Sequence, residues 1–522
     1  MPPVKDQKPK GDSDGEKKRK EARYSKWWVT GLSFCGLTAS YIFGSAHFVP
    51  APPGLQTCLN KVCAGRSNCV RYSGTDNYRY YTDWIRPWNL VHEVVPAAVV
   101  RPNSAEQVAA VVKCGAEHNV KVQAKSGGHS YANYGLGGRD GAISIDLENF
   151  QYVELDTAED SWQARVGGGT RLGKVDDELN KKRRSFAHGV CPGVGIGGHA
   201  TIGGLGPMSR MWGATLDHID EVEVVTANAQ VIRANTHNNS DLFYAVRGAG
   251  AGFGIVTEFV MKTHPVPEDV IHYTYHFQFS HLPELVDMFL AWQTLAADPL
   301  LDPRLGTEFI LWTRGATVSG TFYGTEAELK RTGILDRLPR GKDPVALRRT
   351  SWEGSLADGA SREALYAADV PCKFLSKSLA FTRDDVLSRA QIEDLFRWID
   401  KQHKGTHLWS IIFDATGGQI SKVPAESTAY AHRDKFMFYQ SYGVNVFSGA
   451  KETKNFLTGF HDKLLQTLPQ RDHGTYPGFV DPELKKPQEA YWMGNLPQLE
   501  RIKAKWDPTD LFHNPGSVRP VV

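Results

Sequence analysis

Residues 188–219 read HGVCPGVGIGGHATIGGLGPMSRMWGATLDHI, and this stretch says most about the fold. Cys191 precedes a run in which glycine recurs at short intervals. Because glycine has no side chain, such a run lets backbone approach a ligand or another loop closely. The stretch therefore predicts a ligand-binding loop with a thiol at the edge of the ligand. Two roles stay open for that thiol: a catalytic thiolate paired with His129, His188 or His199, or a covalent tether.

Two further glycine-rich segments share this character. Residues 125–138, KSGGHSYANYGLGG, place His129 in a turn directly after a predicted strand, where backbone amides can surround an anionic or flat ligand. Residues 247–264, RGAGAGFGIVTEFVMKTH, follow a helical pattern and lead into a β-branched strand. A Rossmann loop has the opposite order, strand and then helix. We therefore predict that this third segment is a tight turn facing a cofactor.

Several other classes of site are excluded or disfavoured. The sequence contains no P-loop and no CxxC or HExxH spacing, so we expect no metal site, and no GxSxG stands between a predicted strand and helix as a nucleophile elbow requires. A Cys–His protease is a third interpretation, which is disfavoured because its chemistry does not require this density of glycine. With 60 Lys and Arg against 58 Asp and Glu, the chain lacks the positive field that attracts nucleic acid.

The three segments resemble the berberine-bridge-enzyme-like branch of the vanillyl-alcohol-oxidase superfamily, above all the fungal glucooligosaccharide oxidases and related carbohydrate oxidases. The resemblance extends from about Cys58 to the C-terminus and includes TAYAHRD (428–434), YWMGN (491–495) and DPTDLFHNPGSV (507–518). It implies FAD bound covalently, through His129 to the flavin 8-methyl group and through Cys191 to flavin C6. It also implies contacts to the cofactor from Ser126, Gly127, Gly128, Ser130, Gly198, His199, Gly203, Gly204, Val256 and Asn495.

The resemblance also bears on proton transfer. Hydride removal from a C–OH carbon requires a base for the hydroxyl proton. In the sugar oxidases of the family this base is a tyrosine tuned by an aspartate; the aspartate matches Asp414, and a further active-site tyrosine matches Tyr131. The base tyrosine is missing, because residues 478–481 read GFVD and the phenylalanine, Phe479, cannot accept a proton. Of the positions that present polar groups to sugar, Gln440 is retained and Ile412 is not polar.

Three interpretations of the missing phenol stay open. Tyr131, Tyr476 or Asp414 serves as the base, the substrate is less polar than an oligosaccharide, or catalysis is impaired. Ala200 matches the small residue that oxidases of the family carry near the flavin, which favours reoxidation by O2 with release of hydrogen peroxide. We therefore expect FAD-dependent oxidation of an alcohol or a carbohydrate lactol. The alternatives are a secondary-metabolite alcohol oxidase or dehydrogenase and a catalytically idle flavin-binding surface protein.

The pattern along the chain predicts an α+β fold with two lobes. Residues 55–265 alternate short β-rich runs with helical patterns, whereas residues 266–469 carry longer, aromatic-rich strands typical of a large antiparallel sheet covered by helices. We expect the first part and the returning segment 470–522 to form a vanillyl-alcohol-oxidase (PCMH-type) FAD domain. The middle part would bind a small-molecule or oligosaccharide substrate. A monomer is expected.

The N-terminal region predicts targeting. Residues 1–26 are densely charged, residues 27–46 have no charged side chain, and the Pro-rich residues 49–54 follow as a joint. Because roughly 20 apolar residues can cross a bilayer, we favour a signal anchor with a cytosolic basic flank, and a cleaved signal peptide is the alternative. Either one directs the enzyme domain to the secretory pathway, secreted or as a type II membrane protein.

The cysteines agree with an oxidising compartment. Four of them crowd the start of the domain: Cys58, Cys63, Cys69 and Cys114. Disulfides are expected there, and we favour Cys58–Cys114 with Cys63–Cys69, although sequence alone does not choose among the three pairings. Asn238-Asn239-Ser240 is a weak glycosylation sequon.

Overall fold

The structure is a computed structural model that describes residues 48–521 except 76, 159–160, 314, 340–345, 365–370 and 446–448. The expected targeting segment at 27–46 lies outside the described residues. Across the described ranges, no helix is long and apolar enough to cross a bilayer. The described chain packs earlier than Leu55, because Ala51 is buried and the amide of Val49 donates to Ser73 Oγ over 3.1 Å. The Pro-rich segment is therefore part of the fold and leads directly into a helix.

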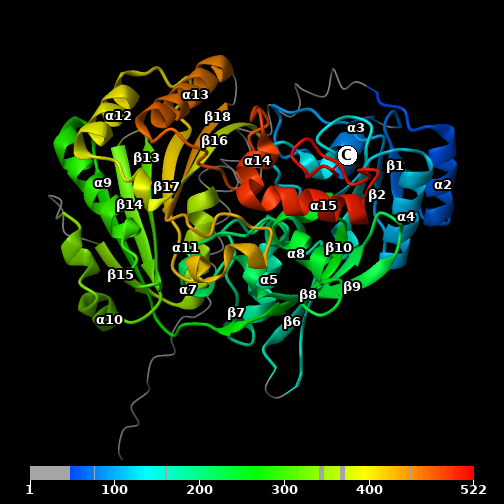
Figure 1. Cartoon of the computed structure of the whole chain (residues 1–522), viewed down its shortest axis with the longest axis horizontal. Helices are drawn as coiled ribbons and strands as arrows, with labels where there is room; N and C mark the ends of the chain where they lie inside the picture. Colours follow the sequence, from blue (N-terminus) through cyan, green and yellow to red (C-terminus); the bar gives the residue numbers. More distant parts are fainter. Residues whose placement is uncertain are drawn as a thin grey trace, which may run out of the picture. The chain divides into compact units, whose positions relative to one another are not determined.

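The first part of the chain builds two small sheets (Figure 1). One has the strand order β1-β2-β4-β3, in which β2 and β3 run parallel to β4. The other has the order β5-β6-β10-β8-β9, and its neighbours are antiparallel. Their strands are β1 (Val70–Tyr72), β2 (Ala98–Val100), β3 (Val122–Lys125), β4 (Ile143–Asp146), β5 (Val153–Leu155), β6 (Gln163–Gly167), β8 (Ile219–Val225), β9 (Val231–Asn235) and β10 (Ile255–Lys262).

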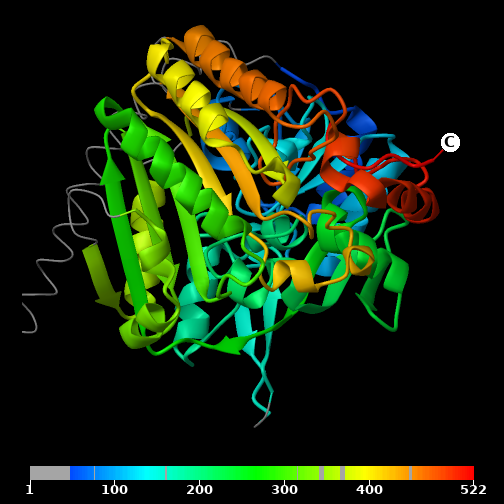
Figure 2. The ribbon, with the colours of Figure 1, turned by 60° about the vertical axis from the view of Figure 1, so that its left-hand side comes forward.

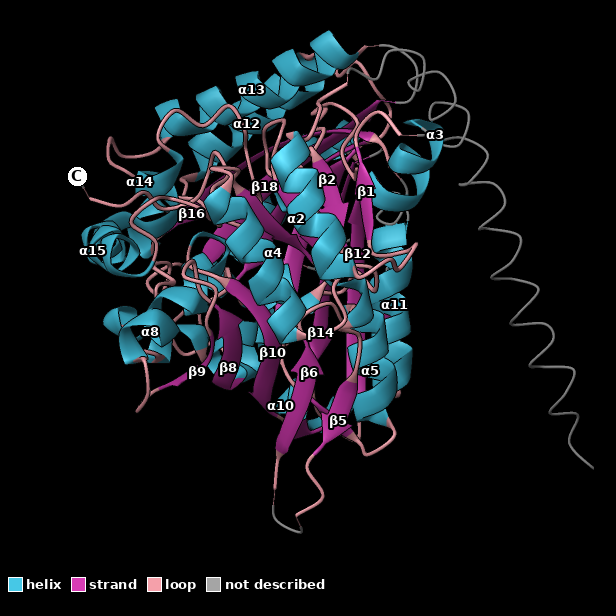
Figure 3. Cartoon of the chain, turned by 90° about the vertical axis from the view of Figure 1, so that its right-hand side faces the viewer, coloured by secondary structure: helices cyan, strands magenta, loops and turns pink. Residues whose placement is uncertain are grey.

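Helices cover these two sheets. Figure 3 shows α2 and α4 side by side over the first sheet. The hydroxyl of Ser104 caps α4 by accepting the amide of Gln107, which is the usual role of serine at a helix start. The helices are α2 (Pro53–Cys63), α4 (Ala105–Glu117), α5 (Leu172–Asn180), α6 (Ile196–Ala200), α7 (Ser209–Trp212) and α8 (Ser240–Ala249).

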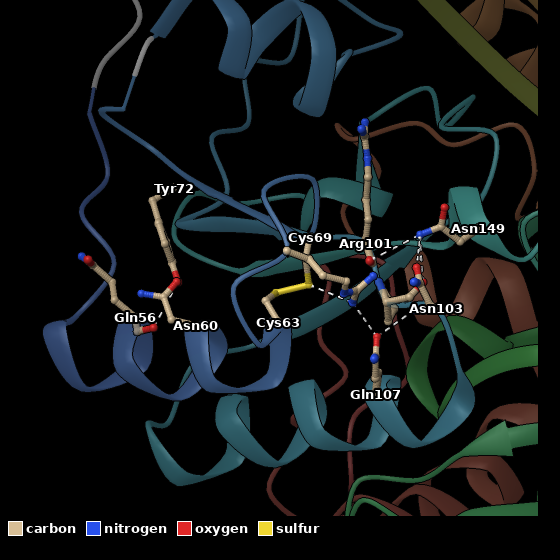
Figure 4. The surroundings of a disulfide bond; sticks show 11 residues. Gln56, Asn60, Cys63, Cys69, Tyr72, Arg101, Asn103, Gln107 and Asn149 are labelled. Carbon is tan, nitrogen blue, oxygen red and sulfur yellow. Dashed lines mark hydrogen bonds between the residues drawn. A yellow bond between two sulfur atoms is a disulfide. The ribbon is translucent and has the colours of Figure 1, made fainter.

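Two disulfides fasten this region, and both predicted pairs are confirmed. Cys58 in α2 bonds to Cys114 in α4, and Cys63 at the end of α2 bonds to Cys69 ahead of β1. Figure 4 shows the second bond, with Tyr72 turned back toward α2. The Tyr72 hydroxyl donates to Asn60 Oδ1 over 2.8 Å. Helix α2 is thus held to both α4 and β1.

The middle part forms one large antiparallel sheet of order β15-β12-β14-β13-β17-β18-β16. Helices α9, α12 and α13 lie along one face (Figure 2). The strands are β12 (Val270–Phe277), β13 (Leu305–Trp312), β14 (Gly315–Phe322), β15 (Ala346–Thr350), β16 (Lys373–Phe381), β17 (Trp409–Ala415) and β18 (Met437–Asn445). The helices are α9 (Leu282–Ala297), α10 (Glu326–Arg331), α11 (Trp352–Ala364), α12 (Arg389–Lys401) and α13 (Ala450–Thr467). The predicted α+β class, with a large antiparallel sheet covered by helices, is confirmed.

Strand alternation divides the side chains of this sheet between two faces. Successive residues of a strand point to opposite sides. Met437 and Tyr439 of β18 pack into the core beneath the helices, as does Phe413 of β17. The residues that alternate with them along the strands therefore lie on the opposite face of the sheet. Asp414, next to Phe413, and Gln440, next to Tyr439, are among these residues.

The C-terminal segment returns to the first part as α14 (Pro487–Trp492) and α15 (Leu496–Trp506). Met493 adopts a φ of 44°, outside the helical range, and separates α14 from α15. Helix α15 ends before Asp507-Pro508. Beyond it, Leu511 accepts a hydrogen bond from the amide of Val122 in β3 over 3.0 Å.

Candidate active site

Two of the glycine-rich loops cross at Gly127 and Gly195. A Cβ atom on Gly127 would lie 2.3 Å from Gly195 N, and one on Gly195 would lie 2.1 Å from Gly127 N. Glycine alone allows this approach, because any side chain would collide with backbone. The hydroxyl of Ser126 adds a hydrogen bond to Gly168 O over 2.7 Å. The crossing brings the segment that carries His129 to the segment that carries Cys191.

His129 and Cys191 are both partly buried at this crossing. Cys191 and Cys372 are the described cysteines outside the disulfides. Imidazole nitrogen and thiolate sulfur are nucleophiles that can form C–N and C–S bonds to a flavin ring. A Cβ on Gly198 would meet no atom within 4 Å, so the backbone of the second loop borders open space there. These residues fit a flat cofactor held at its edge by two side chains.

Two histidines of the second loop are fixed by polar contacts, His199 within the loop and His188 with Asp176 of α5. The Nε2 atom of His199 accepts the amide of Gly189 over 2.9 Å, while burial and repulsion from His188 lower the pKa of His199 to about 3. His199 is therefore a neutral acceptor. Burial lowers the pKa of His188 as well, but Asp176, with an oxygen 2.9 Å from Nε2, more than offsets this and raises it overall.

Lys125, the residue before the first glycine-rich loop, is held by hydrogen bonds to another segment. It is buried, and its ammonium donates to the carbonyls of Trp84 and Ile85, each over 3.0 Å. Burial lowers its pKa to about 8, although the nearby carboxylate of Asp146 acts in the opposite direction. The residue before the Ser126–His129 turn is thus anchored to the backbone of a different segment.

The other residues predicted to contact the cofactor shape the loops or hold them in place. Gly203 and Gly204 adopt positive φ angles of 139° and 80°. The main chain of Val256, in β10, packs against Gly168, where a Cβ would lie 2.2 Å from the Val256 oxygen. The amide of Asn495 donates to three carbonyls of the 425–429 segment, at 3.2 to 3.4 Å. The hydroxyl of Ser130 accepts the amide of Tyr134 over 3.0 Å.

Four aromatic rings gather beside His129. The Trp88 ring lies 5.7 Å from that of His129 and stacks on Tyr131 at 5.3 Å. Phe374 of β16 lies 4.6 Å from the Tyr131 ring and 5.0 Å from the Tyr442 ring. Trp88, Phe374 and Tyr442 were not among the predicted site residues. Only the period-two pattern of β18, which places Tyr442 on the same face as Gln440, could have indicated one of them.

A chain of hydrogen bonds crosses the face of the sheet. The oxygens of Tyr131 and Tyr442 lie 2.9 Å apart, and Tyr442 also bonds to Gln440 Oε1. Gln440 Nε2 donates to Asp414 Oδ2 over 3.0 Å. The structure thus brings Tyr131, Gln440 and Asp414, three of the predicted residues, into one network through Tyr442.

The hydroxyl of Tyr476 has a partner outside this network. The buried hydroxyl of Tyr476 accepts the amide of Gly204 over 2.8 Å, and burial raises its pKa. The phenol of Tyr476 is therefore directed to the backbone of the cofactor loop. This geometry disfavours Tyr476 among the three candidate bases.

Comparisons with known proteins show the family of this chain. Residues 96–235 match a family described as FAD binding domain, and residues 475–519 match one described as berberine and berberine-like. The FAD-linked oxidoreductase sorD of Penicillium rubens is 35% identical over 476 residues, which are 90% of this chain and 99% of that protein. The chain belongs to the berberine-bridge-enzyme-like FAD-linked oxidoreductases.

Sugar oxidases are also relatives of this berberine-like oxidoreductase. The chitooligosaccharide oxidase of Gibberella zeae is 34% identical over 459 residues, covering 83% of this chain and 89% of that protein. A solved structure of glucooligosaccharide oxidase from Acremonium strictum, described with a 6-S-cysteinyl, 8α-N1-histidyl FAD, has a TM-score of 0.79 at 32% identity. It covers 90% of this chain and 100% of the solved chain. The predicted family, its PCMH-type fold and FAD as cofactor are confirmed.

Proposed function

We propose that this berberine-like oxidoreductase holds FAD through two covalent bonds, from His129 and from Cys191, and oxidises a CH–OH carbon with O2 as acceptor. The observation that carries the proposal is the crossing of the two glycine loops, with the imidazole on one and the thiol on the other. The FAD-binding family and the bicovalent flavin of the Acremonium strictum relative support it. Ala200, a small residue near this crossing, suits access of O2, and hydrogen peroxide would be released.

The mechanism divides into hydride and proton transfer. The flavin, when bound, supplies the acceptor for the hydride. The hydroxyl proton of the substrate needs a different acceptor, and the Tyr131 oxygen is the candidate that lies at the end of the hydrogen-bond chain. Gln440 and Asp414 at the other end keep this chain in one orientation. Trp88 and Phe374 pack against the Tyr131 ring and limit its movement.

The substrate proposed first is a carbohydrate lactol, which would become a lactone. The chitooligosaccharide and glucooligosaccharide oxidases support it, because the chain is similar to both over most of their length. The polar face of the sheet, with Asp414 and Gln440, suits hydroxyl groups. No nucleic acid is proposed as a partner.

A specific observation favours a second substrate class. Ile412 lies in β17 two residues before Asp414 and directly opposite Gln440 of β18. Together with Phe374 of β16, it places apolar side chains on the face of the sheet that carries Gln440, where a sugar-binding site needs hydrogen-bonding groups. A less polar secondary-metabolite alcohol is therefore the alternative substrate.

We also infer that the chain folds in the secretory pathway as a monomer. The two disulfides support the compartment, because such bonds persist under oxidising conditions. The sequence pattern of residues 1–46 supports targeting by a signal anchor or a cleaved signal. Mass measurement of the purified N-terminus distinguishes an anchored chain from a cleaved one.

Two measurements test the proposed function: retention of flavin by the denatured chain and reduction of the flavin by a substrate. Acid-precipitated protein should remain yellow, since a covalently bound flavin stays with the denatured chain. Mixed anaerobically with a panel of oligosaccharides and simple alcohols, the holoenzyme should bleach with at least one of them and then release hydrogen peroxide in air. If no member of a broad panel reduces the flavin, the protein is a catalytically idle flavin-binding protein instead.

A further inference from the structure

We propose that Tyr442 is a positioning residue that makes Tyr131 the proton acceptor of this chain, in place of the phenol that is absent at Phe479. The inference rests on the proposed function. It assigns a role to a strand residue that the sequence did not single out. The observations that carry it are the direction of the hydrogen bonds, the enclosure of the two phenols and the different placement of the other nearby tyrosines.

The hydrogen bonds run in one direction. An ionised Asp414 only accepts, so the amide group that faces it must be the Nε2 of Gln440, and Oε1 must face Tyr442. Tyr442 has a single hydroxyl hydrogen, which it gives to Gln440 Oε1. Consequently Tyr131 is the donor of the 2.9 Å bond between the two phenols. The lone pairs of the Tyr131 oxygen are then oriented to accept a hydrogen bond from a substrate hydroxyl.

The same arrangement favours the anion of Tyr131. When Tyr131 has lost its proton, the hydroxyl of Tyr442 turns from Gln440 and donates to the phenolate oxygen. A hydrogen bond to a charged oxygen is stronger than one to a neutral oxygen, so it lowers the pKa of the phenol. In the reaction, the substrate O–H proton passes to the Tyr131 phenolate, the C–H electron pair leaves as hydride to the flavin, and the carbon becomes a carbonyl.

Both phenols are held in place by the surrounding structure. The side-chain amide of Asn89 donates to the Tyr131 carbonyl over 2.6 Å and to the Phe374 carbonyl over 2.9 Å. Asn89 therefore ties the loop that carries Tyr131 to β16, next to β18. Tyr442 is almost fully buried in the sheet. In such surroundings a hydrogen bond between phenols is stronger than in water.

The neighbouring tyrosines are placed differently. Tyr476 is bonded to Gly204, as described above. Tyr439 precedes Tyr442 by three residues in β18 but points into the core beneath the helices, where its hydroxyl donates to Ser441 Oγ over 3.0 Å. Tyr439 is thus a matched control, a buried phenol on the same strand that does not contact Tyr131.

The first test measures ionisation without substrate. Holoenzyme labelled with [13Cζ]tyrosine is titrated by NMR, and the Tyr131 signal is assigned with Tyr131→Phe. We expect Tyr131 to ionise below the ordinary tyrosine pKa of about 10, and Tyr442→Phe to raise that pKa by about one unit. Tyr439→Phe should leave it unchanged. A Tyr131 pKa that is the same in wild type and Tyr442→Phe overturns the inference.

The second test measures the reaction. The rate of anaerobic flavin reduction is followed against pH in wild type, Tyr442→Phe and Tyr439→Phe, at equal covalent flavin content. Tyr442→Phe should move the ascending limb of the pH profile to higher pH by about one unit, which makes the rate about tenfold lower at neutral pH, with little change in KM. An unshifted limb overturns the inference. If no substrate reduces the wild type, the proposed function fails, and the NMR titration still decides whether Tyr442 lowers the pKa of Tyr131.

Discussion

The ring of Phe479 packs edge-on against the ring of Tyr476, with 5.0 Å between the ring centres. Tyr476 in turn accepts the amide of Gly204 from the cofactor loop. Phe479 is partly exposed, whereas Tyr476 is buried. A hydroxyl added to the Phe479 ring could therefore remain in contact with solvent or substrate, and the position is suited to substitution.

Phe479→Tyr restores the phenol that sugar oxidases of the family carry. Because the ring is partly exposed, we expect normal folding and a gain of oligosaccharide oxidation. The measurement is an anaerobic flavin-reduction screen of the variant beside wild type. An unchanged substrate profile would mean that the missing phenol is not what separates this protein from its relatives.

His129→Ala and Cys191→Ala test the two attachments separately. Each single variant should keep flavin through the other bond and show an altered absorption spectrum, and the double variant should release all flavin on acid precipitation. Cys372→Ala is the control, since Cys372 is a buried cysteine outside both glycine-rich loops, and its amide donates to the carbonyl of Trp88 over 3.2 Å. Chromophore that stays bound in the double variant would contradict both assignments.

Lys503→Met should be strongly destabilising. Lys503 and Asp507 are both fully buried, 2.6 Å apart, and the ammonium also donates to Gly252 O and Phe512 O. Removal of one partner leaves a buried charge, which costs about 3–5 kcal/mol. Lys505→Met, two residues along the same helix, removes an ion pair whose lysine is 63% exposed and should cost about 1 kcal/mol or less. Urea unfolding measures the loss of unfolding free energy in each variant. Losses of similar size would refute the prediction.

The two disulfides should differ in how much they contribute to the free energy of unfolding. Cys58–Cys114 closes a separation of 56 residues, and Cys63–Cys69 closes one of 6. Because the entropy of the unfolded chain falls more for a longer loop, we expect replacement of the first pair by serine to cost about 4 kcal/mol and of the second about 2 kcal/mol. The free energy of unfolding of the paired variants measures both, and the reverse order would show that native-state contacts dominate.

Acid should destabilise the fold through its buried histidines. Burial, together with His264, lowers the pKa of His218 to about 4, below the ordinary value of about 6.5. The unfolded chain then binds the extra proton first, so stability is lost as the pH falls from about 6.5 to about 4, by at most about 3 kcal/mol for this group. His218→Asn should flatten the dependence of unfolding free energy on pH over this window. Substitution of the exposed His237 by asparagine should not.

Sequence reasoning succeeded where local pattern determines structure. The predicted strands around Val122 and Val256 and the helix-to-strand order of 240–262 all appear, because hydrophobic period and glycine placement act over a few residues. The disulfide pairs were favoured but not fixed by sequence, since pairing depends on how α2 and α4 meet in space.

The site was predictable only in part. His129 and Cys191 stand out because each sits in a glycine-rich loop, but nothing in either loop shows that Gly127 and Gly195 cross. Tyr442 lies in an aromatic strand like many others, and its closeness to Tyr131 arises from contacts between residues 311 positions apart. Such a pair follows from the packing of the sheet against the loop, which no local pattern reveals.

The return of the C-terminal segment has a consequence for biosynthesis. Trp492 donates to Gly248 O over 3.0 Å and Lys503 to Gly252 O over 2.6 Å, so the third glycine loop is held by residues 244 and 251 positions further along the chain. While the ribosome still holds residues 492–503, the loop lacks these supports. The loop is therefore completed only after those residues emerge, and a chain shortened before Trp492 should yield a colourless product.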